Sequence, residues 1–175
     1  AAYFAFNAGW QAGAAYNSTN GGVITTLVAS PGITLGGQFI DNGNGRFELR
    51  LPGVDARADG VLLVNGAKNE DNYALSYPSA DGTAFHIVNH DNGADGDNAE
   101  QDPVSFAYVP LGTAGVTLGR ISGDRGAMLS QGDYTIQRTA AGVDHLEIAG
   151  QSPTTGVLII SPEGGTGLLA NDNVV

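Results

Sequence analysis

Short stretches in which apolar and polar residues alternate make up most of the chain, and turns rich in glycine and asparagine separate them about every 8–12 residues. The clearest pair of stretches covers residues 33–51 and flanks a turn at residues 41–45. In the second stretch Phe47, Leu49 and Leu51 share one face, and charged side chains occupy the other. Because successive side chains of a strand point to opposite faces, this pattern predicts a β-hairpin with one buried and one solvent-exposed face.

Other strands are expected from the same kind of pattern. They lie at residues 61–64, 84–88, 105–109, 134–137, 145–148 and 157–160. Only the Ala-rich residues 8–16 have the composition of a helical turn or two, and Gly9 and Gly13 oppose a longer helix. The chain is therefore predicted to be all-β. The side chains expected in its core are Phe47, Leu49, Leu51, Leu62, Ile136, Leu146, Ile148, Leu158 and Ile160.

The glycines support this prediction. The chain has 27 of them, and several follow an asparagine, a pair that is typical of tight turns with a positive φ. We expect exposed turns of this kind at Asn20, Asn42, Asn65 and Asn92.

The patterns also occur twice in the same order. Phe-Ala-Phe at residues 4–6 matches Phe-Ala-Tyr at residues 106–108, and Gly-Val-Leu-Leu at residues 60–63 matches Gly-Val-Leu-Ile at residues 156–159. Matches that keep one order along the chain indicate an internal duplication. We therefore predict two tandem antiparallel β-sandwich-like modules, residues 1–104 with an acidic loop at 89–102, and residues 105–175.

The motif order resembles the repeat modules of very large bacterial extracellular proteins. The residues that carry it are Phe4-Ala5-Phe6, Leu51-Pro52-Gly53-Val54-Asp55, Gly60-Val61-Leu62-Leu63, Asn69-Glu70-Asp71-Asn72 and Phe106-Ala107-Tyr108-Val109-Pro110. The second copy departs from it, with Ile148-Ala149-Gly150 in place of Leu-Pro-Gly. The resemblance implies a surface or matrix protein and carries no catalytic residues over.

The negative net charge of the chain excludes several classes of binding partner. The net charge is −11, and only 14% of the residues are charged. A polyanion would be repelled, so neither nucleic acid nor an anionic membrane surface is an expected partner. No apolar run is long enough to span a bilayer, and the chain has no cysteine. The start, Ala1-Ala2-Tyr3, is typical of a processed end or of a fragment boundary, and together with the composition it leads us to expect a secreted or surface location.

The motifs of common enzyme classes do not occur. Gly-x-Ser-x-Gly is absent, and the three histidines, His86, His90 and His145, are scattered. Gly112-Thr113-Ala114-Gly115 lacks the Lys and Ser/Thr of a phosphate-binding loop. We therefore expect a protein that is not an enzyme.

The strongest candidate for chemistry is the acidic loop. Oxygen ligands at close spacing in a Gly-containing loop are what Ca²⁺ requires, although the spacing fits no EF-hand. Two interpretations stay open, a Ca²⁺ site and a solvated acidic linker. The candidate ligands are Asp91, Asp95, Asp97, Glu100 and Asp102.

Aromatic residues crowd the start of the chain. Phe4 and Phe6 alternate as on a strand, which predicts core positions. The uncharged start with Tyr3, Phe4 and Phe6 is also a candidate donor strand for a sheet that lacks one. Trp10 and Tyr16 are candidates for a ligand-facing platform that stacks on sugar rings.

Together these features predict a non-enzymatic structural or adhesive module that forms a filament or surface layer by strand complementation. Its expected partners are further copies or other surface proteins. The alternatives are a carbohydrate-binding module, with polysaccharide as partner, and an accessory domain of a larger secreted enzyme.

Overall fold

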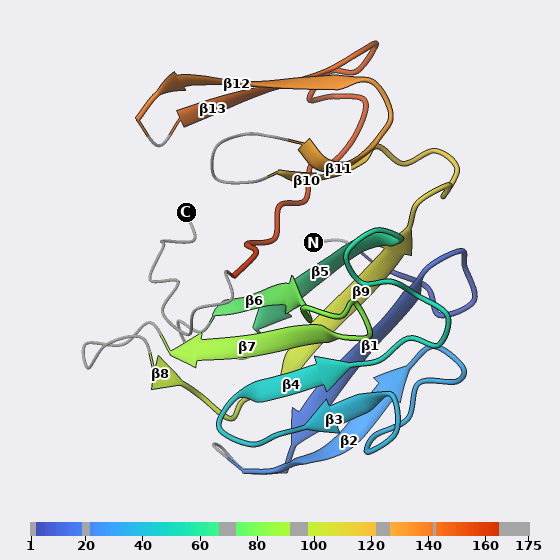
Figure 1. Cartoon of the computed structure of the whole chain (residues 1–175), viewed down its shortest axis with the longest axis vertical. Helices are drawn as coiled ribbons and strands as arrows, with labels where there is room; N and C mark the ends of the chain where they lie inside the picture. Colours follow the sequence, from blue (N-terminus) through green and yellow to red (C-terminus); the bar gives the residue numbers. More distant parts are fainter. Residues whose placement is uncertain are drawn as a thin grey trace. The chain divides into compact units, whose positions relative to one another are not determined.

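The computed structural model describes residues 3–18, 22–66, 73–91, 98–121, 127–141 and 143–164. The thirteen elements in these ranges are all strands, which confirms the all-β prediction (Figure 1). No helix among the described residues is long and apolar enough to span a membrane. The chain divides into two compact units, unit 1 (Ala1–Pro110 with Ser161–Val175) and unit 2 (Leu111–Ile160).

Unit 1 contains two antiparallel sheets. Sheet A has the order β2-β1-β9-β5, and sheet B has the order β3-β4-β7-β6, with the short β8 paired to β7. The strands of sheet A are β1 (Gln11–Asn17), β2 (Ile24–Ala29), β5 (Gly60–Gly66) and β9 (Val104–Pro110). The strands of sheet B are β3 (Phe39–Asp41), β4 (Arg46–Leu49), β6 (Tyr73–Pro78), β7 (Phe85–Asp91) and β8 (Asn98–Ala99).

The two sheets share one hydrophobic core. Phe39 of sheet B is fully buried, and its ring stacks on Phe47 of the same sheet and on Phe106 of sheet A, with ring centroids 5.5 Å apart in both pairs. Such stacked aromatic rings bury a large apolar area and join the two layers. The predicted core positions in unit 1 are confirmed as buried, namely Phe47, Leu49, Leu51 and Leu62.

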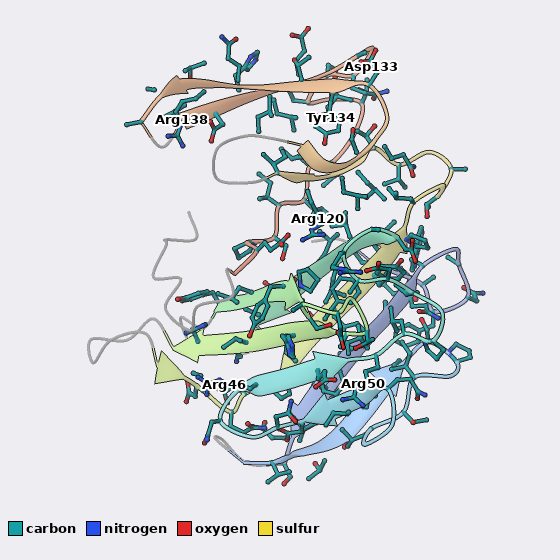
Figure 2. All side chains as sticks on the ribbon, in the orientation of Figure 1. Arg46, Arg50, Arg120, Asp133, Tyr134 and Arg138 are labelled. Carbon is teal, nitrogen blue, oxygen red and sulfur yellow. The ribbon has the colours of Figure 1, made fainter. Side chains whose placement is uncertain are left out.

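The predicted hairpin is confirmed as β3 and β4, although its first strand, expected from residue 33, begins only at Phe39. Phe39 pairs with Leu49, and Asp41 pairs with Phe47. The turn between them needs a left-handed backbone, with φ of 77° at Gly43 and 52° at Asn44. The charged residues Arg46, Glu48 and Arg50 alternate with the buried residues of β4 and so lie on the other face; Figure 2 labels the two arginines. The expected turn at Asn65 is wrong, because Asn65 and Gly66 end β5, whereas Asn20 and Asn92 lie outside the described residues.

The Ala-rich stretch, where a helical turn was expected, is strand β1. A Cβ on Gly13 would lie 2.6 Å from Phe106 Cζ, so the missing side chain makes room for the Phe106 ring of the neighbouring strand. Gly13 pairs directly with Phe106 in the sheet. The contact with β9 therefore overrides the weak helix propensity of the segment.

Unit 2 is built from two hairpins. They consist of β10 (Leu118–Ile121) with β11 (Ala127–Gln131), and of β12 (Tyr134–Ala140) with β13 (Val143–Ile148). Tyr134, labelled in Figure 2, donates a hydrogen bond to Leu129 O at 3.5 Å, which ties the second hairpin to the first. Across β12 and β13, Arg138 and Asp144 form an ion pair at 3.4 Å.

The described part of unit 2 consists of two separate two-stranded sheets, and the predicted second sandwich is not confirmed. Ile136, Leu146 and Ile148 are only half-buried. The core prediction is wrong for Leu158 and Ile160, which are 60% and 80% exposed.

The two units do not follow the predicted boundary after residue 104. The division falls after Pro110, because β9 lies between β1 and β5 in sheet A. Residues 161–164 also belong to unit 1. The internal duplication stays a prediction.

Tyr108 provides a test of the core by pH. Its side chain is buried, and burial together with the negative charge of Asp59 raises its pKa to about 12 from 10.0. Between these two pH values the folded chain keeps the Tyr108 hydroxyl proton, while the unfolded chain releases it. The contribution of this group to the free energy of unfolding is therefore complete below pH 10 and falls as the pH rises from about 10 to about 12. Over that range we expect a loss of about 2–3 kcal/mol in the free energy of unfolding.

The measurement is urea unfolding of the wild type and of Tyr108→Phe at pH values on both sides of this window. The phenylalanine variant keeps the ring against Phe85, 5.7 Å away, and has no proton to lose. We expect the wild type to lose more stability than the variant. Parallel losses in the two proteins would contradict the assigned titration.

Candidate functional site

The described end of the acidic loop is tied to the turn of the β3–β4 hairpin. Gln101 Nε2 donates to Asp41 Oδ2 at 2.8 Å, and the Gly45 N–H donates to Gln101 Oε1 at 2.8 Å. Asp41 also accepts hydrogen bonds from the backbone of Ile24 and Gly43. Gly45 is required here, because a Cβ would overlap the backbone of Glu100. The Asp41 carboxylate therefore serves as an internal link between β2, β3 and residues 100–102.

The five candidate Ca²⁺ ligands differ in burial and in their position in the fold. Asp102 is fully buried, Glu100 is half-buried, and Asp91 is the last residue of β7. Asp95 and Asp97 lie outside the described residues. In the ranges that the structure describes, no group of three His, Cys, Asp or Glu side chains is arranged to hold a metal ion. The Ca²⁺ site stays a prediction.

A second acidic group lines an open pocket of about 570 Å³ beside the turns at residues 51–59 and 79–83. Hydrogen bonds from the Arg57 side chain lower the pKa of Asp55 to about 2. Those from the Ser79 hydroxyl and from Thr83 lower the pKa of Asp81 to about 2. Both carboxylates are therefore ionised at neutral pH, and both accept hydrogen bonds from residues of their own turns.

The histidines of β7 lie against tyrosines of β6. Tyr73 stacks on His90 with ring centroids 5.1 Å apart, and Tyr77 lies 5.0 Å from His86. Each pair is directly opposite across the two strands. These contacts are cross-strand packing of the kind that stabilises a sheet. His145, on β13 of unit 2, is exposed.

The aromatic residues at the start of the chain form a local cluster. Trp10 is half-buried, donates from Nε1 to Ala5 O at 2.8 Å, and meets the edge of Phe4 with centroids 5.6 Å apart. Tyr16 is 44% exposed near the other end of β1, about 20 Å along the strand from Trp10. The sugar platform of Trp10 and Tyr16 stays a prediction.

The expected donor residues form no strand among the described residues. Tyr3 is 90% exposed and Phe6 is 39% exposed, and residues 3–6 are irregular. The prediction that Phe6 is a core residue is therefore wrong, whereas its proposed counterpart Tyr108 is buried. The role of residues 3–6 as donor to another copy stays a prediction.

A different segment complements the sheets of unit 1. Residues 161–164, which we call the arm, lie between the edge strands β5 and β6. Ser161 Oγ accepts a hydrogen bond from Val64 N at 3.1 Å and donates to Val64 O at 3.3 Å. Ser76 N donates to Pro162 O at 3.4 Å, and Gly164 N donates to Ser76 O at 3.0 Å. The arm therefore bonds both edges, and it runs parallel to β6.

The residues directly before the arm are apolar and exposed. We call residues 157–160 the aliphatic segment. Its side chains are 83%, 60%, 41% and 80% exposed, at Val157, Leu158, Ile159 and Ile160. These residues belong to no strand of the structure, although β-branched residues favour extended conformations. The aliphatic segment therefore has a sequence that favours a strand, but it joins no sheet among the described residues.

In the part of the chain that the structure describes, β2 is an edge strand of sheet A. This strand pairs with β1 on one side, and no described strand pairs with its other side. Val28 is 50% exposed, and Val23, just before β2, is 71% exposed. β2 carries no charged residue and no proline, which are the usual means of protecting a sheet edge. The sequence pattern did not predict this strand, since its apolar and polar residues do not alternate.

No family model, no curated protein and no solved structure shows significant similarity to this chain.

Proposed function

We propose that the chain is a non-enzymatic structural or adhesive module of an extracellular assembly, and that copies associate by strand addition through the aliphatic segment. The observation that carries this proposal is the exposure of four consecutive aliphatic side chains in a segment that has no strand partner among the described residues. Short uncharged stretches of high β-propensity are the ones that join the edge of another sheet. The acidic composition, with one lysine in the chain, supports an extracellular location.

The energetics favour a weak, concentration-dependent contact. Adding the segment to a sheet buries one of its faces, two aliphatic side chains worth about 1.5–3 kcal/mol each. Backbone hydrogen bonds add about 0.5–1.5 kcal/mol each. Association itself costs about 4–15 kcal/mol, so a single contact is expected to hold at micromolar concentrations or above. Many copies on a surface or in a filament would reinforce one another.

Sedimentation velocity over a range of concentrations, with electron microscopy of the concentrated samples, tests the proposal. We expect the wild type to form larger species as its concentration rises. The variant Leu158→Lys/Ile160→Lys should remain monomeric, because two charges cannot enter a sheet interface without a large desolvation cost.

The matched control is Val143→Lys/His145→Lys, which adds two lysines at exposed positions of β13. We expect it to associate like the wild type. A wild type that stays monomeric at all concentrations would overturn the proposal, and so would equal association of the wild type and the segment variant.

The alternative function, carbohydrate binding through Trp10 and Tyr16, leads to a different result. Tyr16 is the exposed member of this pair. Binding should change the fluorescence of Trp10, the only tryptophan in the chain, and Tyr16→Ala should abolish the change. A polysaccharide-dependent change of this kind in a monomeric wild type would favour the alternative.

A further inference from the structure

The edges of the unit 1 sheets differ in how they are protected. The edges at β5 and β6 are bonded by the arm, and β3 has only three residues, which leaves little backbone for pairing. β2 has six residues, and no described strand pairs with its outer side. Among the described strands of unit 1, β2 is therefore the edge best suited to accept another strand.

The register of β2 shows which of its backbone N–H and C=O groups point away from β1 and could bond another strand. Ser30 N donates to Ala12 O at 2.8 Å, so at this position the backbone points toward β1. Because successive residues of a strand point their backbone groups to opposite sides, Val28 also points toward β1, while Leu27 and Ala29 point away. At the other end, Ile24 N is bonded to Asp41 Oδ2 at 3.0 Å. The free edge is therefore residues 25–29.

The chemistry of this edge matches that of the aliphatic segment. Residues 22–30 and residues 152–162 contain no charged residue, in a chain with a net charge of −11. Two copies repel one another over most of their surfaces and can approach most closely where both are uncharged. Pairing would cover Val28 on one copy and the exposed aliphatic side chains on the other.

From these observations we infer that the aliphatic segment of one copy adds to the outer edge of β2 in a second copy. This inference rests on the proposed function, and it adds the identity of the strand that accepts the aliphatic segment. Donor and acceptor are different surfaces, so each bound copy presents a fresh donor and a fresh acceptor. Such a head-to-tail contact generates a ring, which can be a reciprocal dimer, where the rotation between copies closes, and a linear polymer where it does not.

The absence of cysteine from the chain allows a crosslinking test. Thr26→Cys and Val28→Cys place a thiol at exposed positions of β2, and Leu158→Cys and Ile159→Cys place one in the segment. A disulfide forms only when the two Cβ atoms come within about 3.5–4.5 Å. Each β2 variant is mixed with each segment variant, oxidised under associating conditions, and examined by non-reducing gel electrophoresis and mass spectrometry.

We expect mixed dimers to exceed same-variant dimers about tenfold in at least one combination, because pairing raises the effective concentration of the two thiols. The control, Val143→Cys mixed with Ile159→Cys, should give only the background level. Val28→Lys supplies a second readout without a crosslink, since a charge on the β2 edge should prevent association in sedimentation while circular dichroism remains unchanged.

The possible failures are distinguishable. If the wild type associates, but no mixed dimer forms and Val28→Lys still associates, the acceptor is wrong and the proposed function stands. If the wild type does not associate, both are wrong. If the double variant Thr26→Cys/Ile159→Cys forms a disulfide within a single dilute chain, the segment pairs with its own β2, which overturns the intermolecular contact.

Discussion

Phe39→Ala is expected to lower the free energy of unfolding of unit 1 by about 3–5 kcal/mol. Phe39 has no exposed surface, and its ring stacks on Phe47 and Phe106. The first ring belongs to the same sheet and the second to the opposite one, so the truncation opens a cavity at the contact between the two layers. The lost stacking adds to the cost of the cavity.

Urea unfolding followed by the fluorescence of Trp10 measures this loss within unit 1. The matched control is Phe6→Ala, which removes the same side chain from a position that is 39% exposed and outside any strand. We expect the control to change stability by less than about 1 kcal/mol. Similar losses in the two variants would show that Phe39 does not join the sheets.

Removal of the arm is expected to have the second large effect. A chain that ends after Ile160 loses the two hydrogen bonds between Ser161 and Val64 and the two that join the arm to Ser76. At about 0.5–1.5 kcal/mol each, their loss should lower the stability of unit 1 by about 2–6 kcal/mol. Leu75, now buried beside Gly164, would also become exposed.

The control is a chain that ends after Gly164 and so keeps the arm. We expect its urea midpoint to match that of the full chain, while the midpoint of the shorter chain falls. Equal midpoints for the two truncated chains would mean that the arm does not hold β5 and β6 together.

The part of the fold that could be predicted from the sequence is the part specified by local patterns. The β3–β4 hairpin combines clean alternation in β4 with a turn whose glycine and asparagine take positive φ, and its turn and second strand were predicted to within two residues. Its first strand was expected from residue 33 and begins only at Phe39. β1 was missed because its alanines favour a helix, and the reason it is a strand, the contact of Gly13 with Phe106, lies 93 residues away in the chain.

The candidate site was harder to predict, for a related reason. The apolar run at residues 157–160 was predicted to be a strand with core positions, and both predictions are wrong, because these residues form no strand and their side chains are exposed. An apolar pattern indicates that a segment favours burial, and it does not indicate whether the surface that buries it belongs to the same chain. The arm likewise shows no local signal, because Ser161 bonds Val64, 97 residues earlier.

The most direct test of the account is hydrogen–deuterium exchange of the backbone amides of residues 157–160 and of Leu27 and Ala29, the β2 residues that point away from β1, measured from about 1 µM to several hundred µM protein. Strand addition hydrogen-bonds these amides only when copies associate. We therefore expect fast exchange in both segments at the lowest concentration and protection that rises in both together as association proceeds. Fast exchange of residues 157–160 in samples that sedimentation shows to be associated would contradict the account.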